Sequence, residues 1–89
     1  MTPGQFYEIT LNLCHRYQAS MTSGFRTVKY NKIKGGHQNS RHPLGLAFDL
    51  VMDDWSQGPA MKKDFNRVGL VCVLEDKGTK NQHYHIQTR

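Results

Sequence analysis

Two short stretches of the chain carry side chains that could hold a metal ion. His42 and Asp49 stand seven residues apart in NSRHPLGLAFDL, and His83 and His85 stand two apart in HYHIQT. Residues two apart on a strand point to the same face, so both imidazoles of the second pair share one face. His42, Asp49 and one of these histidines would form a site of two histidines and one aspartate.

Three protein ligands plus a water are typical of catalytic zinc. Nitrogen and carboxylate ligands without thiolate fit zinc well, although the ligand types leave other divalent metals open. The competing interpretation is a surface histidine, an ordinary turn aspartate and an HxH pattern that arises by chance among five histidines. Spacing alone does not choose between the two interpretations.

The size of the chain limits what else it can be. Its 89 residues predict a single domain over residues 1–89, near the size at which a bound metal adds needed stability. No apolar run reaches the ~20 residues of a membrane span. The N-terminus lacks the basic and then apolar pattern of a signal peptide. We therefore expect a monomer that is made in the cytoplasm and does not span a membrane.

The charge of the chain points weakly to an anionic partner. The formal net charge is +5 and the pI is about 9.5, which would suit nucleic acid or an anionic cell-wall polymer. The sequence shows neither an aromatic platform nor a helix-turn-helix pattern, and nucleic-acid binding would leave the histidines and the aspartate unexplained. We therefore expect no nucleic-acid partner.

The two cysteines predict buried free thiols. Cys14 falls on the apolar face of a predicted helix, and Cys72 lies inside the apolar run LVCVL. A disulfide between them is disfavoured because the sequence shows no export signal.

Two helices are predicted to support the site residues. Thr2, Pro3 and Gln5 match a capping box with proline in the first turn, so a helix is predicted over residues 3–18. A second helix is predicted from Ser56, as its cap, to Arg67. Its predicted buried stripe is Met61, Phe65 and Val68, and Gly69 is predicted to end it.

The remaining segments predict a sheet that presents Asp49 from a central strand. The predicted strands cover residues 20–28, 45–52, 70–75 and 83–88, with a long basic loop over residues 29–43 and a hairpin loop over Asp76–Asn81. This order predicts a compact α+β domain that has a small, largely antiparallel sheet and two helices.

One stretch resembles a known family in full. Ser40–Asp49, SRHPLGLAFD, matches the SxHxxGxAxD signature of the zinc D-Ala-D-Ala carboxypeptidases and peptidoglycan endopeptidases, whose site is similar to that of hedgehog domains. Upstream, SGFRT at Ser23–Thr27 resembles the SGYRS segment of that family. Downstream, HYHIQTR resembles its terminal HxH or FVHVDxR strand. The segments occur in the order of the family, and the chain resembles a small phage-type member.

The resemblance implies a role for each candidate residue of the metal site. His42, Asp49 and His85 would be the ligands of one zinc ion per chain. His83, the first histidine of HxH, would assist catalysis rather than bind the metal.

The resemblance also implies two residues that contact the substrate. Arg26 matches the arginine that contacts the substrate carbonyl or carboxylate, where it would help to stabilise an oxyanion. Ser40 matches the signature serine and would add a supporting hydrogen bond near the site.

The chain departs from the family pattern at two positions. Many relatives place a glutamate base three residues before the final ligand, where this chain has Gln82, which cannot act as a base. We favour His83 as the base, with Glu75 or Asp76 assisting, and Glu75 is the rival base. Gln87 replaces an acidic residue of some relatives, so we expect that an outer partner of the site is lost.

The resemblance implies a zinc metallopeptidase that hydrolyses amide bonds in peptidoglycan stem peptides, as an endopeptidase or a D-Ala-D-Ala carboxypeptidase. It would act at the bacterial cell wall, after phage-mediated release. The alternative is a non-catalytic zinc-containing binding module of the same fold, because fold and ligand set do not guarantee hydrolysis.

Overall fold

The computed structural model describes residues 1–23 and 47–89. Along these ranges the chain forms helix α1 (Pro3–Tyr17), strand β1 (Ala19–Ser23), strand β2 (Ala47–Met52), the short 3-10 helix η2 (Trp55–Gln57), helix α3 (Gly58–Arg67), strand β3 (Leu70–Glu75) and strand β4 (His83–Thr88). None of the helices in these ranges is long and apolar enough to cross a membrane.

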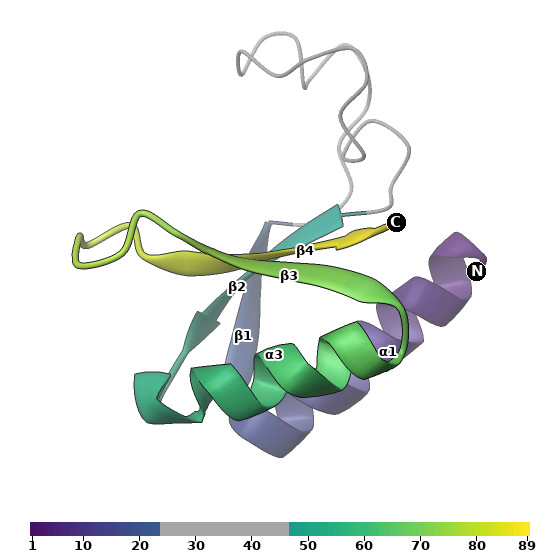
Figure 1. Ribbon diagram of the computed structural model, residues 1–89, viewed down its shortest axis with the longest axis horizontal. Coiled ribbons are helices and arrows are strands. Elements are labelled where there is room, and N and C mark those ends of the chain that lie inside the picture. The colour runs from purple at the N-terminus through teal and green to yellow at the C-terminus, as the bar shows by residue number, and fades with distance from the viewer. Residues whose placement is uncertain (24–46) are drawn as a thin grey trace, which may run out of the picture.

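The four strands form one antiparallel sheet with the order β1-β2-β4-β3. Helices α1 and α3 lie together on one side of this sheet, and its other side faces away from them (Figure 1). The predicted α+β class, with two helices and an antiparallel sheet, is confirmed. The last strand of the chain lies inside the sheet, between β2 and β3.

Helix α1 begins as the sequence predicts. The Thr2 hydroxyl accepts a hydrogen bond from the Gln5 amide at 3.1 Å, and the Gln5 side chain accepts one from the Thr2 amide at 2.8 Å. This reciprocal pair satisfies two amides that a helix start otherwise leaves without partners. The helix ends at Tyr17, because Gln18 adopts the left-handed conformation with φ 55°.

The second predicted helix is correct in place but wrong in detail. Ser56 does not cap it; the Asp54 carboxylate accepts hydrogen bonds from the Ser56 amide at 3.0 Å and the Ser56 hydroxyl at 2.7 Å, and this starts η2 instead. Met61 is fully buried as predicted, but Val68 is 46% exposed because it follows the last turn of α3. Gly69 has φ 86° and ends the helix as predicted.

The core lies between the helices and one face of the sheet. Phe48 and Leu50 of β2 and Ile86 of β4 point into it and are fully buried. Alternate residues of a strand face opposite sides, so Asp49 and His85 lie on the outer face. The core burial of β2 and β4 therefore fixes which side chains the outer face receives.

Cys14 and Cys72 are buried free thiols, as predicted. Burial raises the pKa of Cys14 to about 11 and that of Cys72 to about 12. Both side chains are therefore neutral core residues at physiological pH.

Strand β4 pairs with a different neighbour on each side, and this pairing assembles the outer face. Asp49 of β2 lies opposite His85, and Glu75 of β3 lies opposite His83. Directly paired residues of antiparallel strands point to the same face. Two carboxylates and two imidazoles from three strands are therefore side by side.

Candidate metal and catalytic centre

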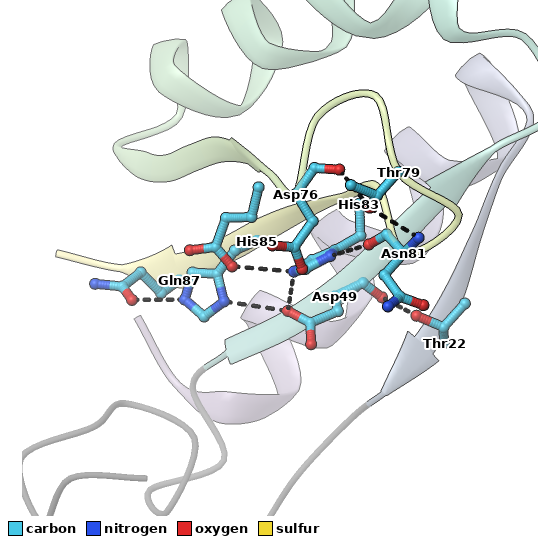
Figure 2. Close-up of polar contacts among 9 residues, drawn as sticks. Thr22, Asp49, Asp76, Thr79, Asn81, His83, His85 and Gln87 are labelled. Carbon is cyan, nitrogen blue, oxygen red and sulfur yellow. Dashed lines mark hydrogen bonds and ion pairs between the residues drawn. The ribbon is translucent and has the colours of Figure 1, made fainter. Parts of the chain in front are cut away.

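Four titratable side chains meet on the outer face of the sheet, and we call them the sheet cluster: Asp49, Glu75, His83 and His85. Figure 2 shows Asp49, His83 and His85 close to one another. Asp49, His83 and His85 are 17%, 19% and 17% exposed, whereas Glu75 is 47% exposed at the end of β3. The cluster is thus partly shielded from water but can be reached from it. A partly desolvated, accessible group of this kind is suited to metal binding and proton transfer.

His85 and Asp49 are arranged as two ligands of one ion would be. Nδ1 of His85 lies 3.1 Å from Oδ1 of Asp49. Two donor atoms on a tetrahedral zinc lie about 3.3 Å apart, because each bond is about 2.0 Å long. The nitrogen and oxygen donors also suit zinc chemically, so this pair fits the predicted metal.

His85 is held at its other ring nitrogen by Gln87. The amide oxygen Oε1 of Gln87 accepts a hydrogen bond from Nε2 of His85 at 2.7 Å (Figure 2). The expectation that Gln87 costs the site an outer partner is therefore wrong. An amide oxygen accepts a hydrogen bond from an imidazole as a carboxylate does, and Gln87 is long enough to reach along the strand.

His83 is held by a separate set of partners. Its Nδ1 donates to the backbone carbonyl of Asn81 at 2.8 Å, and its Nε2 lies 3.0 Å from Oε1 of Glu75. Nε2 is also 3.9 Å from Oδ1 of Asp49. His83 therefore stands beside the His85–Asp49 pair while its closest side-chain contact is a carboxylate outside that pair. Of the two carboxylates that the sequence offered, Glu75 is the one in contact with His83.

The carboxylates stabilise the charged form of both histidines. The hydrogen bond to Asp49 is the largest cause that raises the pKa of His85, and it outweighs burial, which acts in the opposite direction. For His83, burial acts to lower the pKa, but the Asn81 carbonyl together with Asp49 and Glu75 raises it above its ordinary value. The sheet cluster thus attracts positive charge.

Gln82, which stands where many relatives have a glutamate base, has a structural role here. Its amide oxygen accepts a hydrogen bond from the backbone amide of Gly78 at 2.7 Å. This bond closes the loop between β3 and β4, in which Gly78 has φ 82° and Asp76 has φ 53°. The side chain of Gln82 is therefore used to shape the hairpin that carries His83.

A hollow in the surface opens beside the sheet cluster. It has a volume of about 260 Å³, and its lining residues are Thr22, Asp49, Val51, Lys80, Asn81, Gln82 and His83. Polar side chains and one lysine line most of it. Asp49 and His83 therefore both border this hollow.

Three predicted site residues lie outside the described residues: Arg26, Ser40 and His42. Within the described ranges 1–23 and 47–89, no group of three or more histidine, cysteine, aspartate or glutamate side chains has the arrangement of a metal site. The structure thus brings together two of the three predicted ligands, Asp49 and His85. The placement of the third, His42, stays a prediction.

The comparisons with known proteins identify the family of the chain. The sequence model of the family described as peptidase M15 matches residues 9–87, which is most of the chain. A search of curated proteins and a search of solved structures each returned no match to the chain. Because the family match includes the signature stretch and both histidines of β4, the chain belongs to the peptidase M15 family.

Proposed function

We propose that the chain is a zinc-dependent peptidase that hydrolyses amide bonds in the stem peptides of peptidoglycan. Peptidases of the M15 family are generally zinc-dependent. The observation that carries the proposal is the cross-strand pair of His85 and Asp49, whose donor atoms are 3.1 Å apart next to a second histidine. His42 would complete the ligand set from the signature stretch.

The metal would provide a nucleophile at neutral pH, because zinc lowers the pKa of a bound water from 15.7 to about 7. His83 is the residue that we assign to proton transfer. Its Nε2 lies 3.9 Å from Oδ1 of Asp49 and 3.0 Å from Oε1 of Glu75. From this position His83 can take the proton of the attacking water and return it to the leaving amine.

Glu75 assists this step through His83. Its carboxylate is 3.0 Å from Nε2 of His83, so it orients the ring and favours the protonated form that arises during the reaction. Arg26 would stabilise the negative charge that develops on the substrate carbonyl, and Ser40 would add a hydrogen bond near the site. These two assignments come from the resemblance of their motifs.

The substrate class follows from the signature together with the charge of the chain. Peptidoglycan stem peptides carry carboxylates, and the chain has a net charge of +5 with Lys80 among the residues that line the hollow beside the cluster. Synthesis in the cytoplasm followed by phage-mediated release to the wall is the setting that we propose for this activity.

The test is digestion of purified peptidoglycan by the zinc-loaded protein, with separation and mass analysis of the released muropeptides. We expect new products that a chelator abolishes and added zinc restores. Loss of a terminal alanine would identify a carboxypeptidase, and cleaved stems or cross-links would identify an endopeptidase. If the zinc-loaded protein cleaves none of several wall types, the enzyme proposal is wrong and a zinc-containing binding module replaces it.

A further inference from the structure

Gln87 lies two residues after His85 on β4, on the same outer face of the sheet. Its contact with Nε2 of His85, at 2.7 Å, is among the shortest hydrogen bonds of the site. In Figure 2 the imidazole of His85 stands between Gln87 on one side and Asp49 on the other. Gln87 thus occupies the side of the ring that faces away from the proposed metal position.

The hydrogen bond selects which ring nitrogen can bind a metal. A neutral imidazole has one N–H and one nitrogen with a free lone pair. The Gln87 oxygen can only accept, so Nε2 carries the hydrogen, and in the neutral ring Nδ1 would be the nitrogen with the free lone pair. Nδ1 is also the nitrogen that lies 3.1 Å from Asp49. Without a metal, the Asp49 carboxylate accepts a hydrogen bond from Nδ1 and favours the doubly protonated ring. A metal would take the place of the Nδ1 hydrogen, while Gln87 keeps the hydrogen on Nε2.

The neighbours of Gln87 in the sheet fix its backbone and offer its side chain no competing polar partner. β4 is an interior strand, and Gln87 pairs with Ala47 of β2 and with Val71 of β3. Neither of these apolar side chains can compete for the amide oxygen of Gln87 or for the imidazole of His85. The backbone of Gln87 is held by a strand on each side, so its half-buried side chain starts from a fixed position.

We propose that Gln87 is a positioning residue of the zinc centre, because its amide oxygen holds His85 with Nδ1 directed to the metal and thereby sets the zinc affinity. The proposal rests on the zinc dependence proposed above and adds a role for a residue outside the ligand set. A partner of this type on a metal-binding histidine contributes about 10- to 100-fold in metal affinity. A neutral amide raises the basicity of the imidazole less than a carboxylate would.

The experiment compares the zinc dissociation constants of four proteins by competition with a chromophoric chelator at one fixed pH. The proteins are wild type, Gln87→Met, Gln87→Glu and Gln82→Met. Gln82→Met is the matched control, because it makes the same side-chain change in the same hairpin and removes a hydrogen bond of the same length, 2.7 Å, that closes a loop. Folding is checked by circular dichroism and thermal unfolding.

We expect Gln87→Met to bind zinc about 10- to 100-fold more weakly than wild type. Gln87→Glu should bind zinc at least as tightly as wild type, because its carboxylate restores the acceptor. Gln82→Met should keep the wild-type zinc affinity while its unfolding midpoint falls. This pattern would separate a role in metal positioning from a general effect on stability.

Nuclear magnetic resonance of zinc-loaded wild-type protein with labelled histidine gives a second readout that does not depend on any variant. We expect His85 to have zinc on Nδ1 and a proton on Nε2. A proton on Nδ1 with zinc on Nε2 would overturn the proposal, even if Gln87→Met failed to fold. Equal zinc affinity in Gln87→Met and wild type, or equal weakening in Gln82→Met, would overturn it as well.

The outcome also distinguishes this inference from the proposed function. If wild-type protein binds zinc and cleaves peptidoglycan while Gln87→Met behaves like wild type, only the role of Gln87 fails. If wild-type protein takes up no zinc, both proposals fail together.

Discussion

Two polar clusters in this small domain each join segments that are far apart in the sequence, but they treat charge differently. The first is the sheet cluster described above. The second lies between the two helices, and we call it the helix cluster: Arg16, Tyr17, Asp64 and Arg67. In the helix cluster, the Asp64 carboxylate accepts a hydrogen bond from the Tyr17 hydroxyl. It also forms ion pairs with Arg16 of α1 and Arg67 of α3, each at 3.3 Å.

The helix cluster is electrostatically complete. The Tyr17 hydrogen bond is the largest cause that lowers the pKa of Asp64, and Arg67 and Arg16 add to it against the opposing effect of burial. Arginine keeps its charge at every physiological pH. Asp64 is therefore ionised and neutralised under all ordinary conditions, and its role is to join α1 to α3.

In the contacts of the sheet cluster, by contrast, the positive charge depends on protonation. Its contacts join two carboxylates, Asp49 and Glu75, to two imidazoles whose charge depends on protonation. The pKa values of both histidines are raised, so the carboxylates stabilise a positive charge at this place. Carboxylates that stabilise a positive charge on neighbouring imidazoles are suited to a metal ion or a moving proton. The comparison thus separates a cluster of permanent charges from one whose positive charge depends on protonation.

The largest expected effect comes from exchanging one aspartate in each cluster for asparagine. We expect Asp49→Asn to lose zinc binding and to reduce peptidoglycan cleavage to background, because it removes the charge of a proposed metal ligand. Asp64→Asn makes the same change in the helix cluster and should keep both zinc and activity while its unfolding midpoint falls. Metal content and muropeptide release measure the first effect, and calorimetry measures the second. An equal loss of activity in Asp49→Asn and Asp64→Asn would contradict the assignment of metal binding to the sheet cluster and of stability to the helix cluster.

A smaller effect is expected for the outer carboxylate of the sheet cluster. Glu75→Gln should retain zinc and lower turnover by about 10- to 100-fold, because it acts through the orientation of His83. His83→Ala should cost more, about 100-fold or above, because it removes the group that we propose for proton transfer. Single-turnover rates with equal zinc loading measure both. A larger loss in Glu75→Gln than in His83→Ala would transfer the base role to Glu75.

The smallest expected effect is the opposite response of the two clusters to pH in the zinc-free protein. The folded-state pKa of His85 is raised above 6.5, so its stabilisation is full below pH 6.5 and is lost as pH rises through the raised value. The pKa of Asp64 is lowered below 3.8, so its stabilisation is present above pH 3.8 and is lost as pH falls through the lowered value. Thermal unfolding across this range measures both trends.

Asn substitutions identify which cluster causes each trend. Asp64→Asn should reduce the loss of stability in acid, to which Asp54 also contributes, and Asp49→Asn should reduce the loss above pH 6.5, to which His83 also contributes. If the thermal unfolding midpoint of the zinc-free protein increases as the pH is raised above 6.5, the assignment to His85 and Asp49 is contradicted.

The sequence predicted the elements and faces of this domain because these depend on local chemistry. The capping box at Thr2 and Gln5 places the start of α1, and the alternation around Asp49 places that carboxylate on the outer face of β2. Ser56 was predicted as a cap because serine is a common capping residue. Asp54, two residues earlier, accepts both hydrogen bonds of Ser56 instead.

The contacts of the site were less predictable because they depend on strand order. Nothing local in β4 indicates that this last strand inserts between β2 and β3, yet this insertion pairs His85 with Asp49 and His83 with Glu75. The roles of the two departures from the family pattern follow from that arrangement too. Gln82 closes the hairpin loop and Gln87 holds an imidazole, and the sequence alone indicated neither contact.

The zinc content of purified His83→Ala and His85→Ala, measured beside wild type, tests the division of roles within the sheet cluster most directly. The two histidines are neighbours on one face of β4, but His85 pairs with Asp49 and His83 pairs with Glu75. We expect one zinc ion per chain in wild type and in His83→Ala, and none in His85→Ala. Loss of zinc in His83→Ala with retention in His85→Ala would contradict the ligand assignment.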